Sequence, residues 1–137
     1  MKPVNFFYVT EALMPLAGGA DLDDEIERYR DFDSNDEAAV RTVIRTRIIP
    51  YLKSTDEGTQ EWFRHSLEYY LASKDVDFGS LFSAYLVAIY PPDDARCFFV
   101  WIWEELTGRK YEPVDLAAYQ ETDKLPRPKV KLVQPYP

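Results

Sequence analysis

The spacing of hydrophobic residues along the chain is that of amphipathic helices. Leu22, Ile26 and Tyr29 follow one another at intervals of four and three residues, which places them on one side of a helix. Similar spacing recurs in three further stretches, at residues 40–51, 62–71 and 78–89. The pattern therefore predicts a series of helices, each with an apolar side that faces a shared core.

The most apolar stretch, C-F-F-V-W-I-W at residues 97–103, is apolar on nearly all sides. Its composition also fits a buried strand. However, Asp93 or Asp94 can cap a helix before it, and Gly108 can end one after it. We therefore predict a helix from about 94 to 107. An element that is apolar all round belongs at the centre of a fold.

Polar and proline positions predict where several helices start and stop. Ser34 and Glu37 have the spacing of a capping box, in which a hydroxyl and a carboxylate each accept a hydrogen bond from an unpaired backbone N–H. The helix that begins at this capping box must end or kink at Pro50, because proline has no N–H for the helical ladder. Asp77 is expected to cap the helix of residues 78–89.

The two ends of the chain give less regular patterns. Residues 4–16 are compatible with a short N-terminal strand or with the first turns of a helix. Pro113 is expected to open a short helix around residues 114–121. Residues 122–137 hold four prolines and are predicted to form an extended tail.

We thus expect a mainly α fold, with residues 1–137 as one domain of five or six helices around the buried aromatic-rich helix.

Composition narrows the class of protein. Hydrophobic residues make up 46% of the chain and aromatic residues 15%, enough to build a core. The formal net charge is -8, which argues against direct nucleic-acid binding, since that depends on Lys and Arg at phosphates. No apolar run is long enough to span a bilayer, and no signal peptide is recognised. With one cysteine, a cytoplasmic location is expected.

Catalytic and metal-binding patterns are weak. His65 has no nucleophile and no orienting acid beside it in the sequence, and Cys97 lies in the most apolar stretch. Glu104 and Glu105 are adjacent on a helix, where they diverge by about 100° and are not expected to share a substrate. Asp31 opens a sequence like a calcium loop, but the required glycine and bidentate glutamate are missing. We expect no enzyme activity, cofactor or metal.

Residues 21–37 carry nine carboxylates and only two arginines. The N-termini of helices explain part of this cluster, because helix dipoles favour anions there. Asp31 and Asp33 fall near a helix C-terminus, where carboxylates oppose the dipole. We predict that an acidic surface binds a basic partner protein, with an exposed tyrosine as a possible addition. Its predicted residues are Asp21, Asp23, Asp24, Glu27, Asp31, Asp33, Asp93 and Asp94.

A small, acidic, aromatic-rich domain of this kind resembles the immunity proteins of bacterial toxin–immunity systems, in particular those of contact-dependent growth inhibition. The residues that carry the resemblance are D-F-G-S-L-F at 77–82, F-F-V-W-I-W-E-E-L at 98–106 and the acidic residues 21–37. The resemblance implies a cytoplasmic protein that binds and neutralises one cognate toxin, often a basic nuclease domain. The alternatives are an acidic adaptor, a nucleic-acid mimic that counters a defence system, and, ranked last, an enzyme that uses carboxylates.

Overall fold

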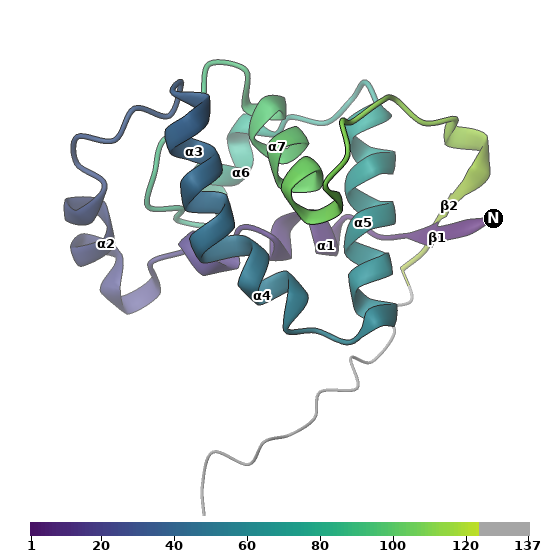
Figure 1. Cartoon of the computed structure of the whole chain (residues 1–137), viewed down its shortest axis with the longest axis horizontal. Coiled ribbons are helices and arrows are strands. Elements are labelled where there is room, and N and C mark those ends of the chain that lie inside the picture. Colours follow the sequence, from purple (N-terminus) through teal and green to yellow (C-terminus); the bar gives the residue numbers. More distant parts are fainter. Residues whose placement is uncertain (124–137) are drawn as a thin grey trace, which may run out of the picture.

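The computed structural model describes residues 1–123, and it is mainly α with one two-stranded sheet (Figure 1). The predicted fold class is confirmed, including the N-terminal strand. The tail predicted at 122–137 lies almost wholly outside the described residues. In order, the helices and strands are β1 (Lys2–Val4), α1 (Phe7–Glu11), α2 (Leu22–Arg28), α3 (Glu37–Val43), α4 (Ile49–Lys53), α5 (Glu57–Ala72), α6 (Gly79–Ala84), α7 (Ala95–Thr107) and β2 (Tyr119–Glu121).

The helix predicted at 94–107 is confirmed as α7, and it lies in the core. Phe98, Phe99 and Ile102 are completely buried there. Asp94 caps the first turn, since its carboxylate accepts a hydrogen bond from the Arg96 N–H at 3.1 Å. Gly108 ends the helix with a φ of 70°, a left-handed conformation that glycine adopts without strain. Local capping signals were therefore sufficient to distinguish this helix from a buried strand.

The capping box predicted for Ser34 and Glu37 is wrong. The N-cap of α3 is Asp36, whose carboxylate accepts a hydrogen bond from the Ala39 N–H at 3.3 Å. Asp36 has an extended backbone, which lets its side chain reach the amide three residues further on. Ser34 lies two residues before the cap and is buried.

Pro50 bends its helix without ending it. The helix continues from α3 through a π-helical turn at Ile44–Ile48 into α4, which runs to Lys53. A π-helical turn is wider than an α-helical one, and it lies directly before the proline, where an α-helical hydrogen bond is missing. The change of direction between α3 and α4 is visible in Figure 1. Counted as one helix, this stretch brings the described residues to six helices.

The helix predicted at 78–89 is too long. As predicted, Asp77 accepts a hydrogen bond from the Ser80 N–H, at 3.2 Å, but α6 ends at Ala84. Leu86 then adopts a φ of 52°, and Val87 forms a bridge with the distant Ala17. Pairing with another segment thus replaces the last turns of the helix and leaves Tyr85 and Leu86 exposed, although the spacing had assigned them to the core, whereas Ile89 stays buried.

The helix predicted around 114–121 is also wrong. Only a 3-10 turn at Leu116–Ala118 forms, and Tyr119–Glu121 is the strand β2. This strand runs parallel to β1, with Lys2 opposite Tyr119. Backbone groups on the facing edges of the two strands pair with one another, and no local sequence pattern indicates this pairing.

Candidate functional site

Helix α2 lies at one end of the molecule, and none of its residues is buried (Figure 1). Arg47, on the helical stretch 37–53, attaches it to the rest of the fold. One guanidinium nitrogen of Arg47 donates to the Tyr29 hydroxyl at 2.9 Å, just after α2. The other donates to a Glu25 carboxylate oxygen at 3.3 Å and to the Pro15 carbonyl at 3.1 Å. A single arginine thus joins both sides of the α2 segment to the core.

The turn into α2 depends on Gly18. A β-carbon there would lie 2.3 Å from the Leu22 Cα, a clash with backbone that no rotamer can relieve. The Gly18 N–H donates to the Leu86 carbonyl at 3.2 Å, and the Ala88 N–H donates to the Leu16 carbonyl at 2.9 Å. These bonds place the segment after α6 directly beside the start of α2.

We expect replacement of Arg47 with glutamine to loosen α2 selectively. The hydrogen bonds that Arg47 makes to charged and polar groups stabilise the position of α2 by about 1–2 kcal/mol, because the site is half-buried. Hydrogen exchange followed by mass spectrometry should therefore speed up across residues 19–30 with a smaller change elsewhere. Arg45→Gln, on the same helical stretch and exposed, is the matched control. Unchanged exchange in α2 would show that Arg47 does not anchor it.

Exposed apolar side chains gather where α2 meets the segment after α6. Ile26 is 48% exposed, Leu86 54% and Tyr90 86%. A shallow cavity of about 130 Å³ lies between Ile26 and residues 87–90. Four of the seven large hydrophobic residues that are exposed in residues 1–123 belong to this region, with Tyr85 as the fourth. Clustering of this kind marks surfaces that bind other molecules.

All eight predicted acidic residues are exposed. On α2, Asp23 precedes Ile26 by three residues and so lies beside it, whereas Glu27 points about 100° away from it. The loop that follows α2 contacts the segment before α7, because the Asp93 N–H donates to the Asn35 side-chain oxygen at 2.8 Å. Two acidic groups about sixty residues apart in sequence therefore meet at the same end of the molecule. We call α2, residues 29–36 and residues 85–94 the α2 surface.

Asp33 stabilises a local turn, a role that the preference of carboxylates for helix N-termini does not predict. Its carboxylate accepts a hydrogen bond from the Asn35 N–H at 2.9 Å, the local contact of an Asx turn. Asp31 has no hydrogen-bond or ion-pair partner among residues 1–123. Of the two aspartates that the sequence singled out, Asp31 has an unpartnered carboxylate among residues 1–123, whereas Asp33 uses one oxygen in the turn and leaves the other exposed.

Leu86 combines exposure with backbone strain. A leucine in the left-handed region costs about 1–2 kcal/mol, so a glycine at this position should leave stability unchanged or raise it by up to about 1 kcal/mol. Leu86→Ala should give no such gain, because its β-carbon keeps the strain. Urea denaturation of both variants measures the difference. A loss above about 1 kcal/mol in the glycine variant would mean that the leucine side chain supports the fold.

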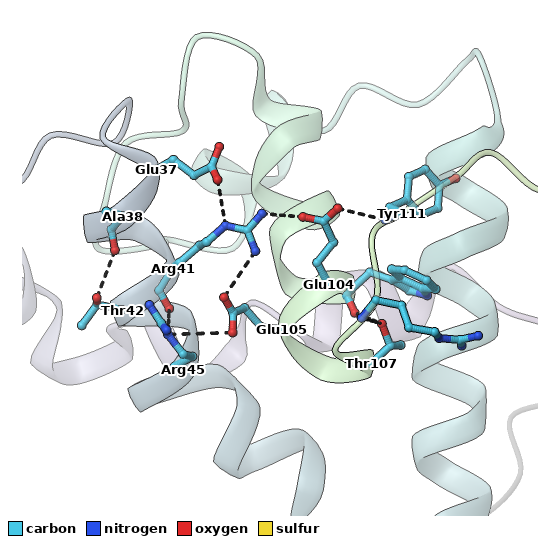
Figure 2. Close-up of polar contacts among 11 residues, drawn as sticks. Glu37, Ala38, Arg41, Thr42, Arg45, Glu104, Glu105, Thr107 and Tyr111 are labelled. Atoms are coloured by element: carbon cyan, nitrogen blue, oxygen red, sulfur yellow. Dashed lines mark hydrogen bonds and ion pairs between the residues drawn. The ribbon is translucent and has the colours of Figure 1, made fainter.

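Glu104 and Glu105 both contact one side chain of the protein itself, Arg41. Both contact the Arg41 guanidinium, Glu105 at 3.3 Å, and Arg41 also donates to Glu37 at 3.0 Å (Figure 2). Burial alone would raise the pKa of Glu104. The hydrogen bond from the Tyr111 N–H and the contact with Arg41 outweigh burial and lower this pKa. This pair of carboxylates therefore ties α3 to α7.

His65 and Cys97 show no catalytic arrangement among the described residues. Burial lowers the pKa of His65, and the imidazole lies 3.4 Å from the Arg64 guanidinium. Burial, together with Asp94, raises the pKa of the half-buried Cys97 thiol, the opposite of what a reactive thiolate needs. Within residues 1–123, no cluster of three or more potential metal ligands forms.

Sequence reasoning singled out the acidic residues of the α2 surface and missed its apolar residues. Residues 85–89 fit the helix predicted at 78–89, whose apolar side was expected to face the core. No helix in residues 1–123 has the length and apolarity to cross a membrane.

Comparisons with known proteins give no match, whether with family models, curated proteins or solved structures.

Proposed function

We propose that this protein is a non-enzymatic inhibitor, of the immunity-protein kind, that binds a basic toxin domain through the α2 surface. The observation that carries the proposal is that the α2 surface combines the exposed apolar residues Ile26, Leu86 and Tyr90 with exposed carboxylates, among them Asp23 and Asp31. Apolar anchors inside a charged rim are typical of specific protein interfaces.

The two halves of the surface would serve different steps of binding. Carboxylates without internal partners attract a basic domain over long range and raise the association rate. Tyr90 and Leu86 would lose contact with water when the partner covers them, which slows dissociation. A nuclease-type toxin fits best, because its substrate cleft must be basic to hold phosphates.

The internal use of Glu104 and Glu105 favours this reading over an enzyme that relies on paired carboxylates. Both carboxylates are paired with Arg41, and their role in joining α3 and α7 accounts for them. The two remaining alternatives, an adaptor and a nucleic-acid mimic, would use the same kind of surface as an inhibitor. The three functions are distinguished by the activity of the free partner, which is toxic only if the protein is an inhibitor of a toxin.

The test is to capture the partner and measure its toxicity. Wild-type protein is used as bait in a lysate of its native cells, with an Asp23→Lys/Asp31→Lys bait as control. A protein held by the first bait only is then expressed in cells, alone and with the wild-type chain. We expect a basic protein that stops growth alone and is harmless with the chain. A captured partner that is acidic, or harmless by itself, would contradict the proposal.

A further inference from the structure

A second site lies at the opposite end of the molecule from α2, where β1 and β2 meet α5 and the turn after α7 (Figure 1). It is an open cavity of about 660 Å³. Basic residues dominate its lining even though the whole chain carries a net charge of -8. The charged residues and the histidine around it are Lys2, Arg64, His65, Glu68, Arg109, Lys110 and Glu112.

Three separate parts of the fold bring the cations together. Lys2 comes from β1, and Arg64 comes from α5. Arg109 and Lys110 follow the left-handed turn at Gly108 that ends α7. Lys2 and Arg64 stand far from Arg109 and Lys110 in the sequence, so no local pattern predicts that these cations lie together.

The cations at the cavity are left largely without carboxylate partners. Among residues 1–123, Lys2, Arg109 and Lys110 form no ion pair, and Arg64 has only a 3.7 Å contact with the exposed Glu61. Lys2 lies 5.3 Å from the centre of the Tyr119 ring instead, and Arg109 5.5 Å from that of Trp103. Arg64 thus resembles five other arginines that each lie within 3.8 Å of a carboxylate, namely Arg28, Arg30, Arg41, Arg45 and Arg47. The cavity cations that have no carboxylate partner among residues 1–123 are Lys2, Arg109 and Lys110.

The floor of the cavity is a fixed polar network around Glu68, which is only 7% exposed. The Tyr119 hydroxyl donates to one carboxylate oxygen at 2.6 Å, and the Trp103 indole N–H donates to the other at 3.1 Å. The Tyr111 hydroxyl donates to the Glu68 backbone carbonyl at 3.0 Å. Both carboxylate oxygens are therefore occupied by neutral donors, and Glu68 makes no ion pair with the cations around it.

We propose that this cavity binds a small phosphate-bearing anion. Arginine offers paired N–H donors that match phosphate oxygens, and lysine adds a mobile point charge. The volume falls in the range of small-molecule sites, large enough for a nucleotide. The proposal is independent of the inhibitor function, since the cavity and the α2 surface lie at opposite ends of the molecule.

The test measures binding of pyrophosphate and of ADP to the full chain by calorimetry, at fixed ionic strength. Both probes carry the phosphate chemistry, and comparing them shows whether a nucleoside contributes. Arg109→Gln/Lys110→Gln is expected to weaken binding at least about tenfold through loss of charge-assisted contacts. Arg28→Gln/Arg30→Gln removes the same charge at the other end and should bind like wild type. Circular dichroism confirms that both variants fold.

An NMR titration locates the site on the wild-type chain. Addition of pyrophosphate should shift the Trp103 indole N–H and the amides of residues 108–112, while the amides of α2 stay in place. Equal weakening in both double variants would mean a nonspecific charge effect and would overturn the proposal. No heat and no shift with either probe at millimolar concentration would overturn it as well.

Discussion

Replacing Arg41 with glutamine is expected to lower the free energy of unfolding by about 2–3 kcal/mol. Arg41 is only 21% exposed at its side chain and contacts Glu37, Glu104 and Glu105 at once. Its loss leaves Glu104 and Glu105, two half-buried carboxylates on adjacent positions of α7, without their main counter-charge. Their mutual repulsion adds to the cost of burial.

Urea denaturation gives this quantity directly, and thermal unfolding should follow with a decrease of roughly 5–10 °C in Tm. Arg45→Gln is the matched control, because Arg45 contacts Glu105 only at 3.8 Å and its side chain is 56% exposed. We expect it to cost less than about 1 kcal/mol, as exposed ion pairs do. Equal effects of the two substitutions would show that the Arg41 network does not hold α3 against α7.

The same network predicts how stability depends on pH. The pKa of Glu104 is lower in the folded protein than its ordinary value of 4.5. The unfolded chain therefore binds this proton first as pH falls, and the contribution of Glu104 is complete above about pH 5. It is lost as pH drops below 4.5 and through the lower folded pKa. The stability gap between wild type and Arg41→Gln should narrow over this range. A gap that stays constant from pH 7 to pH 3 would contradict the assignment.

Replacing Tyr90 with alanine is expected to have the largest effect on partner binding, with dissociation accelerated by roughly 30-fold or more. Tyr90 is 86% exposed, so its side chain contributes little to the fold and is free to enter a pocket of the partner. Surface plasmon resonance with the captured partner gives both rate constants, and unfolding measurements should show a change of less than about 0.5 kcal/mol.

Phe7→Ala is the matched control for Tyr90. Phe7 is also an exposed aromatic residue, at 43%, but it lies on α1 and outside the α2 surface. It should leave both rate constants within about twofold of wild type, as residues outside an interface do. If Tyr90→Ala also leaves the dissociation rate unchanged, the apolar half of the α2 surface is not an anchor.

Local signals in the sequence were sufficient for the centre of the fold. Helix α7 is specified by local features alone, which are the cap at Asp94, the glycine at 108 and the apolar residues between them. Helix spacing likewise located α2, α5 and the kinked stretch 37–53. These elements were predictable because the interactions that define them lie within a few residues of one another.

The errors arose where distant segments pair. Residues 85–90 leave their helical pattern because Val87 bridges to Ala17, about seventy positions earlier. Residues 119–121 form a strand because β1 lies beside them. The α2 surface and the basic cavity both depend on these long-range pairings. Exposure of Leu86 follows from the first pairing, and the second places Lys2 beside Tyr119 at the basic cavity. No spacing rule along the chain contains that information.

The central claim, that the α2 surface binds a basic partner, is tested most directly by the association rate constant. It is measured with the captured partner for wild type and for Asp23→Lys/Asp31→Lys, at low and at high salt. We predict a decrease of about tenfold or more at low salt, which shrinks as salt screens the charges. Glu57→Lys/Glu61→Lys, which reverses two exposed carboxylates on α5, should cause a much smaller decrease. Equal association rates for wild type and Asp23→Lys/Asp31→Lys at low salt would contradict the claim.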